Sequence, residues 1–312
     1  MKNIKHKNIL VTGAKGFVGS NLVSHLSSLG YPNVFTPSSI ELNLLNSETL
    51  SEYLNHHSIH IILHLAGKVG GIGINKDHPG SFFYENALMG INVMHQAYLH
   101  NVEKVVSLAA GCGYPSSIKV PFSEKDFWNG LPDMNSYGYS LAKKNLIVQS
   151  WGYKTEYDFN STVLLPANLY GPHDNFDLDT SHVVPALVRK FLEGVKENSP
   201  HVEVWGSGKA SREFLYVDDA VRAIIDAIGC SECGPFNLGT GVETPIKDLV
   251  AIISELVGYE GLIKFDTSRP DGQRQRFYDM ASFESTFGYT PSTDLRKGLS
   301  KTINWYKENE IQ

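Results

Sequence analysis

A tyrosine and a lysine stand four residues apart near the middle of the chain, at Tyr139 and Lys143. On a helix, this spacing puts both side chains on one face. An ammonium group one turn away from a phenol favours the phenolate and lowers the tyrosine pKa, so the phenol can give or take a proton near neutral pH. The pair therefore predicts acid–base chemistry; the alternative is a solvated helix face.

A second group of residues with a possible function lies near the N-terminus, in the segment NILVTGAKGFVGSNL. Its glycines separate a strand-like run from a helical pattern. Glycines placed there allow a tight turn, and the N–H groups at the start of the helix then face a pyrophosphate. The spacing predicts a dinucleotide site rather than an ordinary strand–helix turn, with a loop formed by Gly13, Lys15, Gly16, Phe17, Val18 and Gly19.

The end of the second expected strand bears on which dinucleotide binds. NAD-binding chains usually carry an acid there, which holds the ribose 2′-OH. Here the residues after Phe35 read TPSSIE, and Glu41 lies too far along for that role. Ser38, Ser39 and Lys15 can instead accept a 2′-phosphate. NADP(H) is therefore expected, and NAD(H) stays open because this segment has no arginine.

The chemistry needs elements that hold these residues together. Strand-like runs alternate with amphipathic segments, which predicts an α/β fold: a Rossmann-type, doubly wound parallel sheet with a smaller C-terminal substrate-binding α/β domain. The cofactor domain is expected over 1–170, with returning segments near 213–242, and the substrate domain mainly over 171–312. The expected strands are 8–12, 33–36, 60–65, 104–109 and 162–165, and the expected helices are 18–29, 47–56, 82–101 and 139–151.

Composition and charge argue against several classes of protein. The net charge of −6 over 312 residues does not favour a nucleic-acid partner. No apolar run approaches the ~20 residues that span a membrane, and no signal peptide is expected. The cysteines, Cys112, Cys230 and Cys233, fit a reducing, cytoplasmic setting. The pair Cys230 and Cys233 has no obvious further ligands nearby, so no metal site is expected.

Longer motifs extend the pattern over nearly the whole chain. They include HLAGKVGGIGINKDHPGSFFYENALM, GCGYP, NLYGPHDNF, SHVVPALVRKF and VWGSGKASREFLYVDD. With these motifs the chain resembles the extended short-chain dehydrogenase/reductases. Within them it is similar to the GDP-L-fucose synthase family, the GDP-4-keto-6-deoxy-D-mannose 3,5-epimerase-4-reductases. The resemblance implies a nucleotide-sugar substrate, roles in polysaccharide biosynthesis and a homodimer, in which helices 82–101 and 139–151 pack against their symmetry mates.

The resemblance also implies roles for individual residues. Tyr139 matches the general acid for reduction and Lys143 its partner, while Cys112 and His182 match the epimerisation pair. The chemistry is consistent, because a C4 ketone acidifies the hydrogens on C3 and C5, and inversion needs a base on one face and an acid on the other. The alternatives are a buried, inert thiol at Cys112 and a loop or helix-cap histidine at His182.

One position departs from the family's pattern. A serine or threonine usually stands four residues before the tyrosine of the strand-end motif, and here Tyr114 is preceded at that distance by Ala110. The missing hydroxyl would hydrogen-bond the sugar ketone, and such a bond contributes about 1–3 kcal/mol in a closed site. The departure opens a second interpretation, an enzyme with only one activity: an epimerase alone, or a 4-reductase on another hexose or heptose.

The remaining candidates bind substrate or cofactor by resemblance. Arginine suits a diphosphate because it stays charged and pairs with oxygens bidentately. Arg212 or Arg276 taken alone is equally well explained as a surface charge. A third hypothesis, a non-catalytic dinucleotide-binding protein, is disfavoured because the catalytic set is retained. The candidates on the substrate side are Lys68, Gly70, Asn168, His182, Val183, Lys190, Trp205, Arg212 and Arg276, and Ala66 and Asn168 are further cofactor candidates.

Overall fold

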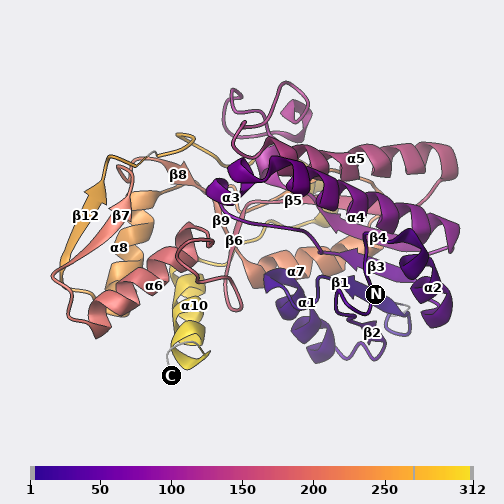
Figure 1. The fold of residues 1–312 in the computed structure, drawn as a ribbon, viewed down its shortest axis with the longest axis horizontal. Helices are drawn as coiled ribbons and strands as arrows, with labels where there is room; N and C mark the ends of the chain where they lie inside the picture. The colour runs from indigo at the N-terminus through magenta and orange to yellow at the C-terminus, as the bar shows by residue number, and fades with distance from the viewer. Residues whose placement is uncertain (1–3, 270, 310–312) are drawn as a thin grey trace.

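The computed structural model describes residues 4–269 and 271–309. Its main feature is a six-stranded parallel sheet with the strand order β10-β5-β4-β3-β1-β2. This confirms the predicted fold class, and Figure 1 shows the sheet with its helices at one end of the molecule. The strands are β1 Ile9–Thr12, β2 Val34–Phe35, β3 Ile61–His64, β4 Lys104–Leu108, β5 Ser161–Pro166 and β10 Phe236–Leu238.

Both faces of the sheet are covered, and most residues of its strands are apolar and buried. In β1, Ile9 and Val11 belong to the core cluster that includes α1 and α7. Leu10 points the other way, into the cluster that includes α2 and α4. Alternate residues of one strand thus face opposite layers. The covering helices are α1 Phe17–Ser28, α2 Ser47–His57, α4 Pro79–Leu99, α5 Tyr137–Tyr157 and α7 Val217–Asp226.

Two glycines set the close packing of α4 against α5, the helix that carries Tyr139. A Cβ atom at Gly138 would lie 2.3 Å from the carbonyl oxygen of Pro79. One at Gly90 would lie 2.6 Å from Leu146 Cδ2. Glycine therefore lets the two helices approach at these points, which fixes the position of the first turn of α5 at the carboxyl edge of the sheet.

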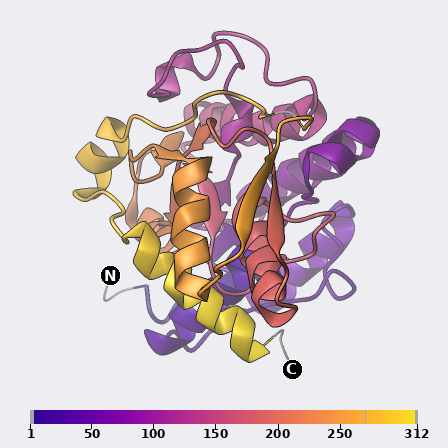
Figure 2. The same ribbon diagram turned by 90° about the vertical axis from the view of Figure 1, so that its left-hand side faces the viewer.

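A separate core cluster lies at the other end of the molecule. Its apolar side chains come mainly from α6, α8, α10 and the strand β7. Figure 2 looks onto this end and shows the orange helix α8 and the yellow helix α10 beside β12 and β7. The elements outside the main sheet are α3 Ile72–Asp77, β6 Asn168–Tyr170, α6 Val183–Lys196, β7 His201–Trp205, β8 Ser211–Arg212, β9 Phe214–Tyr216, β11 Thr244–Pro245, α8 Ile246–Val257, β12 Leu262–Asp266, α9 Ala281–Phe287 and α10 Leu295–Asn309.

Short strand pairs connect the two ends. The strand β6 pairs in parallel with β9, and β8 pairs with β11. Because β10 returns to the main sheet after β9 and before β11, the chain crosses between the two ends more than once. No helix within residues 4–269 and 271–309 is both long and apolar enough to cross a membrane.

Candidate functional site

The glycine loop between β1 and α1 requires glycine at two positions, Gly13 and Gly19. Gly13 has a φ of +71°, and a Cβ atom there would lie 2.7 Å from the backbone nitrogen of Ala66. A Cβ atom at Gly19 would lie 2.1 Å from the carbonyl oxygen of Gly13. Gly16 is the N-cap of α1, and within the described chain no side chain caps this helix start. The first N–H groups of α1 can therefore receive a pyrophosphate, so the loop fits a dinucleotide.

A carboxylate lies beside the residues that we expect to bind the 2′-phosphate of the cofactor. A turn after β2 brings Glu41 back, and its carboxylate accepts hydrogen bonds of 2.8 Å from both the N–H and the hydroxyl of Ser38. These hydrogen bonds lower the Glu41 pKa, with a smaller contribution from the charge of Lys15. Ser39 is exposed. A chain reversal at residues 38–42 thus places a carboxylate beside Ser38, one of the residues expected to accept the 2′-phosphate.

The loop after β3 is held by an asparagine that sequence reasoning missed. The Asn86 side chain accepts a hydrogen bond from the Lys68 N–H and donates one to the Lys68 carbonyl, each 3.0 Å long. The Lys68 ammonium forms an ion pair with Glu85 at 2.5 Å. Gly70 lies on the same loop, and neighbouring Gly71 approaches Thr180 from the segment before His182, with 3.7 Å from a Cβ atom there to the Thr180 carbonyl oxygen.

Tyr139 and Lys143 lie on the first two turns of α5, as the spacing predicts. The Lys143 Nζ atom is 5.9 Å from the centre of the Tyr139 ring and donates a 3.2 Å hydrogen bond to the Leu108 carbonyl at the end of β4. Burial lowers the Lys143 pKa to about 8, although the nearby Cys112 opposes this shift. Burial also raises the Tyr139 pKa, and Cys112 adds to the rise. The expectation of a lowered tyrosine pKa is thus contradicted, because desolvation outweighs the ammonium.

Cys112 lies in the short 3₁₀ turn Gly111–Gly113 that follows β4. Its thiol is half-buried and unbridged, and it interacts electrostatically with Tyr139 and Lys143. His182 is the N-cap residue of α6 and remains open to solvent. The protein around it removes enough hydration to lower the imidazole pKa below its usual value. The structure therefore brings Cys112, Tyr139 and Lys143 together, and it places Thr180, two residues before His182, beside Gly71.

Two arginines come together from distant segments. The Arg212 guanidinium donates hydrogen bonds to the carbonyls of Ser211 and Gln273, at 2.7 and 2.6 Å. Burial lowers its pKa to about 10, and the charge of Arg276 contributes. Arg276 reaches the strand-end turn, since its Nη2 atom would lie 3.2 Å from a Cβ atom on Gly111. Two guanidinium groups held this close favour a doubly charged anion such as a diphosphate.

A buried carboxylate, Glu213, organises this side of the site, and sequence reasoning missed it. It is only 1% exposed and accepts backbone hydrogen bonds from Thr240, from Gly241 at 2.6 Å and from Tyr278 at 2.8 Å. Burial raises its pKa despite these donors. The Asn168 amide donates a 3.0 Å hydrogen bond to the Glu213 carbonyl. Glu213 thus ties β6, β9 and the segment of Arg276 together.

Further substrate-side candidates lie on α6 and β7. The Trp205 ring is 58% exposed and lies between two cations, with Lys190 Nζ at 5.2 Å and the Arg269 guanidinium at 4.9 Å from its centre. Val183 begins α6 directly after His182 and is half-buried. An open aromatic ring beside cations can stack on a flat, polar ring such as a nucleobase.

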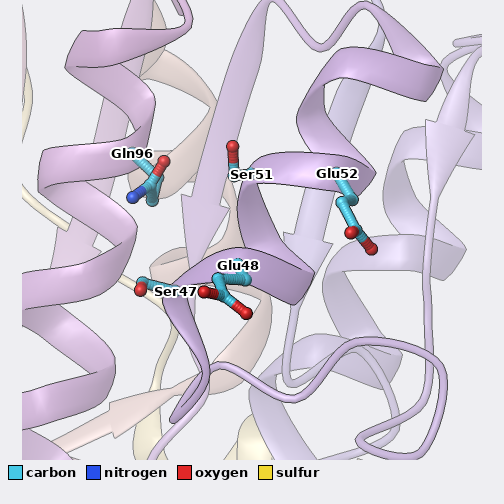
Figure 3. A pocket seen from close by; sticks show the side chains of 5 residues that line it. All are labelled: Ser47, Glu48, Ser51, Glu52 and Gln96. Carbon is cyan, nitrogen blue, oxygen red and sulfur yellow. The ribbon is translucent and has the colours of Figure 1, made fainter.

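A shallow hollow lies elsewhere, between α2 and α4 (Figure 3). Polar side chains line it, and none of them belongs to the residues discussed above. It therefore adds nothing to the candidate site. Its lining residues are Ser47, Glu48, Ser51, Glu52 and Gln96.

The fold and the clustered residues define a class of protein: Rossmann-type enzymes that carry a tyrosine–lysine pair at the carboxyl edge of the sheet. The model of the NAD dependent epimerase/dehydratase family matches residues 9–239. The chain therefore belongs to the NAD dependent epimerase/dehydratase family, and the prediction of an enzyme is confirmed.

Known proteins match over nearly the whole chain. The GDP-L-fucose synthase of Escherichia coli (strain K12) is 34% identical over 314 residues, covering 97% of this chain and 98% of that protein. The structure of a GDP-6-OMe-4-keto-L-xylo-heptose reductase from C. jejuni has a TM-score of 0.90 at 28% identity, covering 97% and 98%. A GDP-L-fucose synthetase from Naegleria fowleri bound to NADP has a TM-score of 0.88 at 26% identity, covering 98% and 95%. The predicted resemblance is thereby confirmed.

Proposed function

We propose that the protein is an NADP(H)-dependent enzyme that inverts C3 and C5 and reduces the C4 ketone of a GDP-4-keto-6-deoxy sugar. The observation that carries the proposal is the grouping of a thiol, Cys112, with the half-buried Tyr139 and the buried Lys143 at one edge of the sheet. A reductase alone needs the tyrosine–lysine pair, whereas inversion also needs a proton donor and acceptor such as a thiol. The named activities of the relatives support the coarser class, a GDP-sugar epimerase or reductase.

The two ends of the molecule divide the work in this proposal. Residues 1–170, with returning segments near 213–242, hold the cofactor, and 171–312 mainly hold the nucleotide sugar. NADP(H), when bound, supplies the hydride for C4. The NADP in the Naegleria fowleri relative supports this form of the cofactor. In the proposal Ser38, Ser39 and Lys15 lie near the 2′-phosphate. The residues that hold the rest of the cofactor are Gly13, Gly16, Phe17, Val18, Gly19, Ala66, Lys143 and Asn168.

Four side chains take part in the proton transfers of epimerisation and reduction. Cys112 and His182 act on opposite faces of the sugar, one removing the proton from C3 or C5 and the other returning one. The C4 ketone makes this possible because it stabilises the carbanion as an enolate. During reduction Tyr139 donates its phenolic proton to the C4 oxygen, and the Lys143 ammonium stabilises the phenolate left behind. A Lys143 pKa of about 8 keeps most of this ammonium charged at pH 7.

The substrate is held from several segments. Arg212 and Arg276 pair with the diphosphate, and Trp205 and Val183 flank the base, with Lys190 beside Trp205. Lys68, Gly70 and Asn168 border the sugar. Charge at the two arginines and an open aromatic ring support this arrangement.

The test is incubation with GDP-4-keto-6-deoxy-D-mannose and NADPH in deuterated water, followed by absorbance at 340 nm and by proton NMR. We expect NADPH oxidation and deuterium at C3 and C5. Cys112→Ser and His182→Asn should each abolish most of the exchange, while Cys230→Ser, which changes a half-buried thiol outside the site, should leave both readouts unchanged. If the wild-type protein shows no NADPH oxidation and no deuterium exchange, the proposal is refuted.

A second candidate function is 4-reduction alone, on a hexose or heptose. Ala110 favours it, since the strand end lacks the usual hydroxyl, and the named heptose reductase from C. jejuni supports it. NADPH oxidation without deuterium at C3 or C5 would establish this reductase and would remove the roles of Cys112 and His182. Exchange without oxidation would indicate an epimerase alone.

We also propose a cytoplasmic homodimer built on α4 and α5. Large apolar side chains are exposed on both helices, and these would become buried against a second copy. Sedimentation should give a dimer, and Val148→Glu should shift it toward the monomer; a concentration-independent wild-type monomer would refute the proposal. The exposed side chains include Phe83, Ile91, Leu99, Val148 and Trp151.

A further inference from the structure

The strand-end turn after β4 offers no hydroxyl to a substrate. Ala110 and Gly111 precede Cys112 there, and neither residue has a side-chain group that can form a hydrogen bond. In the proposed reaction the C4 oxygen gains negative charge, both when a neighbouring carbon loses its proton and when hydride arrives. A donor aimed at that oxygen would stabilise both steps.

A hydroxyl from a distant part of the chain lies beside Gly111, the residue that follows Ala110. A Cβ atom on Gly111 would lie 1.7 Å from the hydroxyl oxygen of Tyr278 and 3.0 Å from its Cζ atom. A serine oxygen is bonded directly to Cβ, so the Tyr278 oxygen lies close to where a serine at position 111 would put its own. Any side chain at Gly111 would exclude the end of the Tyr278 ring, so the two positions are complementary.

The Tyr278 ring is held firmly. It is 3% exposed and packs on Tyr114, with 5.7 Å between the ring centres. Its backbone N–H donates to the buried Glu213 carboxylate at 2.8 Å, and its hydroxyl donates to the Pro166 carbonyl at the end of β5 at 3.2 Å. A group fixed in this way needs little reorganisation to serve a transition state.

The charges around the hydroxyl suit a hydrogen-bond donor. Burial raises the Tyr278 pKa, so the phenol keeps its proton. The positive charge of Arg276 opposes part of that rise. A nearby cation polarises the O–H bond and strengthens its donation. Cys112 also interacts electrostatically with Tyr278, which places the hydroxyl in the same group as the proposed catalytic residues.

We propose that the Tyr278 hydroxyl, at the side-chain position of Gly111, compensates for the hydroxyl that Ala110 lacks and donates a hydrogen bond to the C4 oxygen of the sugar. This inference rests on the proposed function. The O–H turns from Pro166 toward the sugar by rotation about the C–O bond, and the ring stays in place. No proton is transferred from Tyr278: the hydrogen bond polarises the carbonyl, and Tyr139 remains the proton donor.

The test compares Tyr278→Phe with the double variant Tyr278→Phe/Ala110→Ser. Tyr278→Phe removes the hydroxyl alone, and kcat for NADPH oxidation should fall roughly 10- to 100-fold with KM for NADPH unchanged. Adding Ala110→Ser returns a hydroxyl to the strand end and should recover part of the loss, which a purely structural role of Tyr278 would not allow. The matched control is Tyr259→Phe, because Tyr259 is also buried and donates to a backbone carbonyl, that of Ser199, at 3.0 Å.

The inference is overturned if Tyr278→Phe keeps kcat within about threefold of the wild type, or if Ala110→Ser restores nothing. If the wild type turns over no GDP-4-keto sugar, the proposed function fails and a binding measurement decides the inference. In protein labelled with ¹³C at tyrosine Cζ, the Tyr278 resonance is the one missing from Tyr278→Phe. If the Tyr278 resonance shifts with GDP-mannose and NADP⁺ but not with GDP and NADP⁺, contact of the hydroxyl with the sugar is supported. If the resonance has the same position under both conditions, the inference is overturned.

Discussion

The cofactor side and the sugar side of the site are built in different ways. The glycine loop at Gly13–Gly19 is one continuous segment, and it offers backbone N–H groups. The sugar side combines side chains from the β4 turn, from α5 and from the segment of Arg276 and Tyr278. A backbone site tolerates almost no change, because a single Cβ atom fills it. A side-chain site can lose a group at one position and receive it from another, as at Ala110 and Tyr278.

The largest effect should follow from removing the proton donor on the sugar side. Tyr139→Phe is expected to lower kcat for NADPH oxidation by about 10²- to 10⁴-fold, because general acid catalysis contributes that much. Tyr137→Phe changes an exposed tyrosine two residues earlier on the same helix and should leave kcat nearly unchanged. Equal effects of the two changes would remove Tyr139 from the chemistry.

On the cofactor side, Gly19→Ala should have a nearly equally large effect, in this case on the binding of NADPH. The added Cβ atom meets the Gly13 carbonyl oxygen at 2.1 Å and must displace the loop. We expect NADPH affinity to fall roughly 100-fold and the free energy of unfolding to drop by about 1–3 kcal/mol. Gly152→Ala on α5 is the control, since the described structure leaves open space around a Cβ atom there. Fluorescence titration with NADPH gives the affinities, and an unchanged affinity in Gly19→Ala would contradict the backbone site.

The diphosphate contact should give a smaller effect. Arg276→Gln removes one charge from the pair with Arg212 and should weaken GDP binding about 10-fold, equal to about 1.4 kcal/mol. Calorimetric titration with GDP measures it. Arg296→Gln removes a comparable charge from an exposed ion pair with Glu255 and should not alter the affinity. If GDP binds Arg276→Gln as it binds the wild type, Arg276 acts only near the sugar.

The smallest effect should appear as a pH dependence. The Lys143 pKa is lowered to about 8, so its ammonium is lost as the pH rises above 8. We expect kcat for reduction to fall severalfold between pH 8 and 9. Stability should behave oppositely, because the unfolded chain binds more protons at this lysine between its folded and ordinary pKa values, and the cost of burying its charge disappears there. A parallel loss of stability over this range would attribute the fall in activity to unfolding instead.

Several features of the site follow from short stretches of sequence. The turn conformation of Gly13 and the i, i+4 spacing of Tyr139 and Lys143 depend on neighbours in the chain, so their patterns predicted both elements. The return of Glu41 to Ser38 was missed although it is local, because a carboxylate folding back over a turn has no distinct pattern. Glu213, Asn86 and Tyr278 were missed for another reason: their partners lie on other segments, and a single buried acid, amide or tyrosine has no periodicity.

The pKa of Tyr139 shows the same limit. The sequence places an ammonium one turn away and predicts a lowered pKa. The structure adds the burial, which depends on every segment packed around α5, and burial reverses the direction.

The sequence by itself determined the α/β alternation, the dinucleotide loop, the tyrosine–lysine pair and the family resemblance, because each depends on residues close in the chain or on motifs in order. Only the tertiary structure decided which side chains share the sugar side and what their protons do. Hydrogen bonds and desolvation act over a few ångströms in space, and the fold brings together residues such as Gly111 and Tyr278 that the chain keeps far apart.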